Sequence, residues 1–297
     1  MRNIRQILCP IDLSDASRPA VDHARVLAQW YKAKITVLHV CNPIVMPPIE
    51  FVAVGAMSPP VLTEDERCNA RQDVLEFIGG ERNDANVVIE SGQAAPGILK
   101  VASDLPADLI VIGTHGIGGF EHLLLGSVTE KVLRRAACPV LTVPPRARMT
   151  SRLPFKRLLC PVDFSEPSLA ALDLALSFAQ EGDADLTILH VFERSADEEP
   201  LANRPIVAPE YLREVEAEFT ARLHALVPQK VGDSCRPQAR TAHGKPYREI
   251  LGIATEDQVD LIVMGVHGRS ALDLMLFGST TNQVVRRATC PVLTLRR

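Results

Sequence analysis

The chain has 297 residues, a length typical of about two domains. Hydrophobic residues make up 46% and aromatic residues only 4%, which predicts sizeable, mostly aliphatic cores. The net charge of −4, from 32 basic and 36 acidic residues, argues against nucleic-acid binding, which needs a basic face. No apolar run reaches the roughly 18 residues that span a bilayer, and the first residues lack a signal-peptide apolar core. We therefore expect a cytoplasmic protein without a membrane segment.

Strand and helix patterns alternate along the first half of the chain. The expected strands are residues 4–11, 34–41, 87–90, 108–113 and 139–143, and the expected helices are residues 15–31, 64–81, 96–103 and 127–136. Residues 42–62 are apolar and rich in proline, which predicts a loop.

The second half repeats this order. The expected strands are residues 155–162, 185–191, 237–241, 260–265 and 291–295, the helices are residues 166–180, 209–226, 246–256 and 279–288, and a loop is expected over residues 192–208.

An internal repeat explains the repeated order. The offset is 151 residues near the start of each copy and 152 residues from Gly92 and Gly244 onward. Over residues 108–143, 20 of 36 positions are identical to their partners in residues 260–295. We therefore expect a domain over residues 1–145, a linker over residues 146–154 and a second domain over residues 155–297.

Strands that alternate with helices predict an α/β fold, in which each copy has a parallel sheet with helices on both faces. In such sheets ligands bind beyond the carboxyl ends of the strands. The last strand of each copy has no helix after it and would expose an unpaired edge. We therefore expect the two last strands to pair antiparallel and to join the halves as an intramolecular pseudo-dimer; a homodimer of the chain is a further option.

Glycines follow the fourth strand of each copy with the same spacing: a glycine, a second one three residues later, nine further residues and a Gly-Ser pair. Glycine lets a ligand approach main-chain N–H groups, and a helix N-terminus stabilises an anion. The pattern favours phosphate binding over a purely structural turn. Ser127 and Ser279 are expected either to cap the following helix or to donate to a phosphate oxygen.

Two further residue types reach the same edge of the sheet. Asp12 and Asp163 follow the first strand, where the carboxylate would either contact a ligand hydroxyl or a metal ion beside phosphates, or form an Asx turn. For His39 and His190 we expect a buried, hydrogen-bonded role. His115 and His267 lie inside the glycine loop and either reach a phosphate or line the loop.

Other chemistries lack their motifs. The sequence has no P-loop, no dinucleotide fingerprint, no nucleophile elbow and no zinc-finger spacing. We find no pair of base and nucleophile, so we assign no catalytic residue. The seven cysteines form no Cys-x-x-Cys pair, and we expect buried free thiols rather than metal or redox ligands.

Four segments together resemble the universal stress protein family: Cys-Pro-Ile-Asp-Leu-Ser, Leu-His-Val, the glycine pattern, and Cys-Pro-Val-Leu-Thr-Val. The similarity covers both halves and is typical of a tandem member. It implies an adenine-nucleotide-binding fold with five parallel strands per domain, of the adenine nucleotide alpha hydrolase-like type, and dimerisation through the last strand. The cofactor that it implies is ATP, with Mg²⁺ held near Asp12 and Asp163 by the phosphates rather than by a protein cage.

The resemblance also implies the binding residues. In the first half they are Pro10, Asp12, Val40, Gly113, His115, Gly116, Gly126, Ser127, Val128 and Thr129. In the second half they are Pro161, Asp163, Val191, Gly265, His267, Gly268, Arg269, Gly278, Ser279, Thr280 and Thr281. The residue after the second glycine is often basic in the family; Arg269 fits and Ile117 does not, so we expect the first site to bind phosphates more weakly.

Three functions remain open at this point. The leading hypothesis is an ATP-binding regulator or sensor of the stress response. The alternatives are a slow ATPase and a nucleotide-free interaction scaffold.

Overall fold

The computed structural model describes residues 4–42, 62–79, 85–116, 125–147, 155–193, 209–227, 235–266 and 278–296. Most of the 42–62 loop, the second-half glycine loop with His267, Gly268 and Arg269, and most of the 146–154 linker lie outside these residues. Internal contacts separate the chain into one unit that spans Asn3–Pro145 and another that contains Arg146–Arg297.

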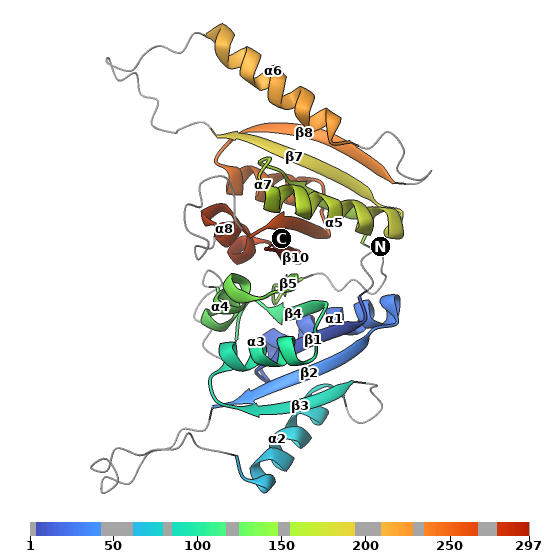
Figure 1. The fold of residues 1–297 in the computed structure, drawn as a ribbon, viewed down its shortest axis with the longest axis vertical. Coiled ribbons are helices and arrows are strands. Elements are labelled where there is room, and N and C mark those ends of the chain that lie inside the picture. Colours follow the sequence, from blue (N-terminus) through green and yellow to red (C-terminus); the bar gives the residue numbers. More distant parts are fainter. Residues whose placement is uncertain are drawn as a thin grey trace, which may run out of the picture. The chain divides into compact units, whose positions relative to one another are not determined.

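The first unit is a five-stranded parallel sheet in the order β3-β2-β1-β4-β5 (Figure 1). Its strands are β1 (Gln6–Ile11), β2 (Lys34–Cys41), β3 (Asn86–Ser91), β4 (Leu109–Gly113) and β5 (Val140–Val143). Its helices are the short η1 (Asp15–Ser17), α1 (Arg18–Tyr31), α2 (Glu64–Phe77), α3 (Ala94–Asp104) and α4 (Ser127–Arg135).

The second unit repeats this sheet in the order β8-β7-β6-β9-β10. Its strands are β6 (Arg157–Pro161), β7 (Asp185–Glu193), β8 (Arg236–Gly244), β9 (Leu261–Gly265) and β10 (Val292–Leu295). Its helices are α5 (Glu166–Gly182), α6 (Pro209–Ala225), α7 (Pro246–Glu256) and α8 (Ser279–Arg287). The expected α/β fold with parallel sheets is therefore confirmed in both halves.

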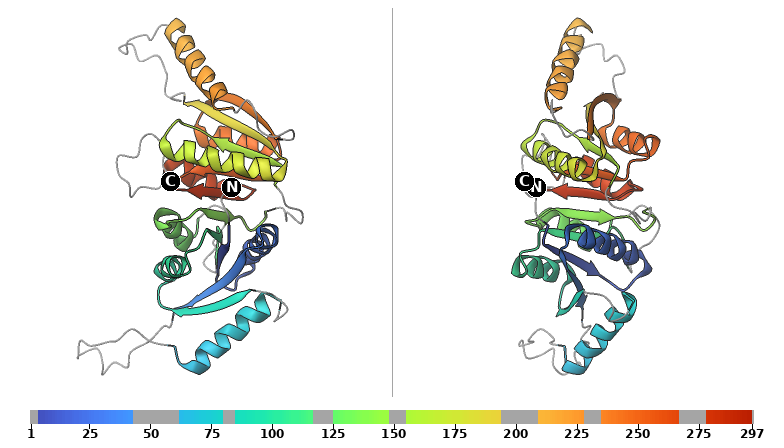
Figure 2. Two further views of the ribbon diagram at one scale, coloured as in Figure 1. Left: turned by 45° about the vertical axis from the view of Figure 1, so that its right-hand side comes forward. Right: turned by 90° about the vertical axis from the view of Figure 1, so that its right-hand side faces the viewer.

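Helices cover both faces of each sheet, which explains why the central strands are apolar throughout. In the first unit α1 packs on β1, β2 and β4, while α3 packs on β2 and α4, and Figure 2 shows α1 and α3 on opposite faces. All five residues of β4 are buried, as are all five of β9. The strand order reverses between β1 and β4, so the loops after these two strands open a crevice at the carboxyl edge.

Two elements have the expected bounds, namely the strand 34–41 and the helix 246–256. Others differ at their ends. Strand β7 continues through Glu193, two residues into the segment expected as a loop, because it pairs with the long strand β8 up to Gly244. Helix α3 begins at Ala94, two residues before the expected start, because a proline is tolerated in the first helical turn. Within the described residues, no helix is long and apolar enough to cross a membrane.

Candidate functional site

A cavity of about 440 Å³ lies at the carboxyl edge of the first sheet, where the strand order reverses. This volume falls in the range of small-molecule sites, roughly 300–1,000 Å³. All ten positions expected for the first half line it. Its wall also contains seven residues that the sequence reasoning did not include: Ile11, Ser17, Leu38, Ala94, Ile98, Ile112 and Leu125.

The cavity wall contains both apolar side chains and polar groups. The β2 side is formed by Leu38 and Val40 together with Ala94 and Ile98 of α3. The opposite side is formed by the loop after β4 and by the first turn of α4. The site therefore combines an apolar slot with a set of main-chain and hydroxyl donors.

The start of α4 supplies the donors. Its N-cap is Gly126, which has no side chain, and no side-chain hydrogen bond caps the helix. Of the two roles considered for Ser127, the cap is therefore excluded; Ser127 is the first helical residue and lines the cavity. An N-terminus without a side-chain cap leaves main-chain N–H groups and a partial positive charge for an anion.

Buried hydrogen bonds fix this helix start against the end of β4. The hydroxyl of Thr129 donates to the Gly113 carbonyl at 2.8 Å, and the Gly126 N–H donates to the Thr114 carbonyl at 2.8 Å. Thr129 is only 4% exposed, so its hydroxyl is held in a nearly dry setting. These hydrogen bonds therefore hold the first turn of α4 against the glycine that ends β4.

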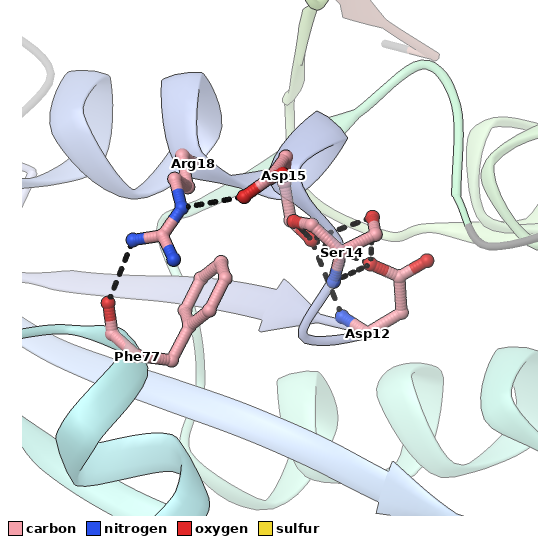
Figure 3. A network of polar contacts seen from close by, with 6 residues as sticks. Asp12, Ser14, Asp15, Arg18 and Phe77 are labelled. Atoms are coloured by element: carbon pink, nitrogen blue, oxygen red, sulfur yellow. Dashed lines mark hydrogen bonds and ion pairs between the residues drawn. The ribbon is translucent and has the colours of Figure 1, made fainter.

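Asp12, in the loop after β1, also lines the cavity; Figure 3 shows its polar contacts. Its Oδ1 accepts from the Ser14 N–H at 3.1 Å, from the Ser14 hydroxyl at 2.6 Å and from the Ser17 hydroxyl at 2.5 Å. The Asx turn considered from the sequence is thus present, and the same residue also lines the cavity. Leu13 has a φ of 63°, which few non-glycine residues adopt, so this loop stores some strain.

Helix α1, which follows this loop and η1, begins with a residue that contacts α2. The Arg18 guanidinium lies 4.4 Å from the centre of the Phe77 ring and donates to the Phe77 carbonyl at 3.3 Å (Figure 3). In the second unit the Arg222 guanidinium of α6 lies 4.4 Å from the centre of the Phe164 ring, next to Asp163 in the chain. The centres of the Phe164 and Phe219 rings are 5.5 Å apart.

Two glycines of the first site leave little or no room for a side chain. A Cβ at Gly116 would overlap Oδ2 of Asp12. A Cβ at Gly113 would lie 3.3 Å from the Ala16 carbonyl oxygen, on the loop after β1. Glycine is therefore needed because the loops after β1 and β4 approach each other closely here.

The histidines at the ends of β2 and β7 have the expected structural role. Nδ1 of His39 donates to the Ile11 carbonyl at 3.0 Å, and Nδ1 of His190 donates to the Val162 carbonyl at 2.7 Å. His190 is 6% exposed, whereas His39 is only partly buried. His115 in the glycine loop lines the cavity and pairs through Nδ1 with the Thr114 hydroxyl at 2.8 Å.

The second half repeats both features, the hydrogen bonds around the aspartate and those at the helix start. Oδ1 of Asp163 accepts from the Ser165 N–H at 3.1 Å and from the Ser165 hydroxyl at 2.5 Å. The Thr281 hydroxyl donates to the Gly265 carbonyl at 2.9 Å, and Gly278 is the N-cap of α8 without a side-chain cap. As with Ser127, of the two roles considered for Ser279 the cap is excluded.

The close approach of loops is also repeated. A Cβ at Gly265 would lie 2.8 Å from the carbonyl carbon of Pro167. Of the expected second-half positions, the structure describes Pro161, Asp163, Val191, Gly265, Gly278, Ser279, Thr280 and Thr281.

The cysteines are all free thiols. Burial raises the pKa of the Cys9 thiol to about 12 and that of Cys290 to about 12, which keeps both protonated and poorly reactive at neutral pH. The expectation of burial is wrong for Cys68, which is exposed, and Cys41 and Cys138 are only partly buried.

Comparison with known proteins places this architecture in a family. The universal stress protein family matches residues 3–144 and 154–296. The chain is 30% identical over 298 residues to a universal stress protein of Mycolicibacterium smegmatis, covering 98% of this chain and 96% of that protein. It is 28% identical over 270 residues to one of Mycobacterium tuberculosis, covering 89% and 87%.

A solved structure has the same fold along the whole chain. The crystal structure of a universal stress protein from Archaeoglobus fulgidus aligns with a TM-score of 0.63 at 24% identity, over 100% of this chain and 97% of that one. With two family matches that together span nearly all residues, the chain belongs to the universal stress protein family and carries its domain twice.

Proposed function

We propose that the chain is a cytoplasmic ATP-binding regulator of the stress response, with ATP held in the cavity of the first half. The observation that carries the proposal is the cavity of about 440 Å³, whose wall contains every position that the sequence marks as nucleotide-binding in that half. Nucleotide occupancy would bias the conformation of the loops that form the wall, and so the binding of a partner.

The chemistry of the wall matches the three parts of an adenine nucleotide. The apolar slot beside Val40 and Ile98 suits the faces of a purine base. The Asp12 carboxylate is an acceptor for ribose hydroxyls. The first turn of α4, with Gly126 and Ser127, suits the phosphates, because a helix N-terminus supplies N–H donors and positive charge.

A magnesium ion fits this set of donors. Mg²⁺ is usually held by one or two carboxylates together with substrate phosphates and waters. Asp12 is the carboxylate on the cavity wall, and its Oδ1 is already engaged by Ser14 and Ser17. Asp12 would then help to hold the ion in place of accepting from a ribose hydroxyl, and the ion would offset the charge of the phosphates.

The test is equilibrium binding of ATP to the purified full chain by calorimetry, with two variants of Ser127. Ser127→Glu places a carboxylate on the first helical turn, where it favours the helix but repels phosphate. Ser127→Gln has similar size without the charge and is the matched control. We expect the glutamate variant to lose at least tenfold in ATP affinity at the first site and the glutamine variant to lose much less.

Two results would contradict the proposal: no binding by the wild type at millimolar ATP, or equal affinity of both variants and wild type. An assay for ADP after prolonged incubation separates a pure binding protein from a slow ATPase. Mass spectrometry of any ligand retained through purification identifies a nucleotide-free scaffold if none is found and none binds.

A further inference from the structure

A group of basic side chains lies around one tyrosine of the second unit, where the first turn of α7 meets the last turn of α8. The Cζ atoms of Arg287 and Arg248 lie 5.3 Å and 5.9 Å from the centre of the Tyr247 ring. Nε of Arg248 also donates to the Tyr247 hydroxyl at 3.1 Å. Lys245 is the N-cap of α7. We call these four residues the basic cluster, and its three cations are all exposed.

The charge of the basic cluster is not compensated by nearby carboxylates. Among the described residues, none of its three cations forms an ion pair, whereas Arg134 of α4 pairs with Glu130 at 2.6 Å. The pKa of the Tyr247 phenol is lowered, first by the hydrogen bond that it accepts and further by the charges of the three cations. The cluster is therefore a local site of positive potential on a chain whose net charge is −4.

The stability of α7 does not explain these cations. The N-terminus of a helix carries a partial positive charge, so Lys245 and Arg248 stand where a cation is unfavourable. Glu249 is an acidic residue of the same turn, but its carboxylate lies against Gly244 and pairs with none of the three cations. Residues that break a local rule without a structural gain are typical of functional sites.

The first unit lacks the cluster at the corresponding positions. At the 152-residue offset, the cluster residues of α7 and its N-cap are replaced by uncharged residues, Gln93, Ala95 and Pro96. Arg287 alone has a basic counterpart, Arg135 at the end of α4, where a cation is favourable. The repeated fold therefore keeps the arginine at the end of its last helix and does without the other three residues.

We propose that the basic cluster docks an acidic segment of a partner protein. A guanidinium presents a planar fork of N–H donors that binds a carboxylate in bidentate fashion, and two such groups lie close to one tyrosine ring here. Tyrosine and arginine are also enriched among the side chains that contribute most of the binding energy of protein interfaces.

Other anionic partners fit the cluster less well. Nucleic acid is bound by a basic stripe or face, which three cations on a chain of net charge −4 do not form. Binding to an anionic lipid surface takes clusters of about 4–8 basic residues. A short acidic peptide needs only the few charges that the cluster supplies. The inference does not depend on the proposed function, because none of the four residues belongs to the expected nucleotide sites.

The test measures the binding of a fluorescein-labelled octaglutamate peptide to the purified full chain by fluorescence anisotropy at low salt, with octaglutamine carrying the same dye as the control peptide. We expect only octaglutamate to bind, and Arg248→Gln and Arg287→Gln each to lower its affinity at least about threefold. Arg135→Gln makes the same change of charge at the corresponding place in the first unit and should leave the affinity unchanged. Arg287→Lys keeps the charge without the planar fork and should also weaken binding.

Several results would overturn the inference. One is equal affinity of octaglutamate for Arg287→Gln, Arg135→Gln and the wild type, which would assign the binding to general attraction. Another is equal binding of the two peptides. A third is binding of phosphatidylserine vesicles that Arg287→Gln abolishes, without any binding of octaglutamate. A chain that binds octaglutamate but no ATP removes the proposed function alone, and a chain that binds ATP but no octaglutamate removes this inference alone.

Discussion

Substitution of Gly116 by alanine tests whether the loops after β1 and β4 must approach each other to form the cavity. The new methyl group would overlap Oδ2 of Asp12. One of two things must then move: the carboxylate of Asp12 or the backbone of the glycine loop. Gly116 does not have a positive φ, so alanine brings no backbone strain of its own.

The hydrogen bonds of Asp12 decide which of them moves. Its Oδ1 accepts three hydrogen bonds from Ser14 and Ser17, and bonds to a charged group contribute about 1.5–3 kcal/mol each. Displacing the carboxylate would therefore cost roughly 5 kcal/mol or more, whereas overpacking relieved by a backbone shift typically costs about 1–3 kcal/mol. We expect the glycine loop to move away from Asp12 and to widen the phosphate end of the cavity.

The predicted result is a loss of ATP affinity of tenfold or more, about 1.4 kcal/mol, with a loss of unfolding free energy no larger than about 3 kcal/mol. Calorimetric titration and urea unfolding measure the two quantities. Gly252→Ala is the matched control: a Cβ there meets nothing within 4 Å, and alanine in the middle of α7 should stabilise the chain by about 0.5–1 kcal/mol. If Gly116→Ala kept the ATP affinity and stability of the wild type, the close approach of these loops would not matter for the site.

Three further predictions concern buried groups. Thr129→Val removes the hydroxyl that donates to Gly113 and should lower the unfolding free energy by about 1–3 kcal/mol, measured by urea unfolding, while Thr129→Ser keeps the bond and should cost less. His23 is 3% exposed, its Nε2 has no hydrogen-bond partner among the described residues, and burial lowers its pKa below 6.5. His23→Leu removes this unpaired group but also the bond from Nδ1 to the Pro19 carbonyl, so it should stabilise the chain by about 1 kcal/mol. Below pH 6.5 the unfolded state gains a proton that the folded state resists, so the wild type should lose stability more steeply than His23→Leu as the pH falls, and parallel pH profiles would refute this. In thiol labelling at pH 8, the exposed Cys68 should react first and the buried Cys9 only after unfolding. Equal labelling rates of the two thiols would contradict the burial of Cys9.

Much of the site could be predicted from the sequence because the relevant residues stand at strand ends. In a parallel sheet the carboxyl ends of the strands share one edge, so Pro10, Val40 and Gly113 had to come close together once the alternation was recognised. The glycine spacing likewise located the start of α4 at the correct residue.

The remaining features depend on conformations that the pattern does not encode. The hydrogen bonds around Asp12 are accompanied by a left-handed backbone at Leu13. Leucine rarely adopts this conformation, so the sequence does not predict it. The apolar wall formed by Leu38 and Ile98 was missed because a buried strand or helix residue gives the same signal whether it faces a core or a cavity. The sequence left open whether Ser127 caps the helix or faces a ligand, because it does not show that the glycine before it takes the cap position.

In each unit a stacked guanidinium joins the region after the first strand to an outer helix. In the first unit Arg18, the first residue of α1, stacks on Phe77 of α2, and in the second unit Phe164, in the loop after β6, is stacked by Arg222 of α6. Because Phe164 is the neighbour of Asp163 in the chain, a backbone shift of that loop would also change its contact with α6.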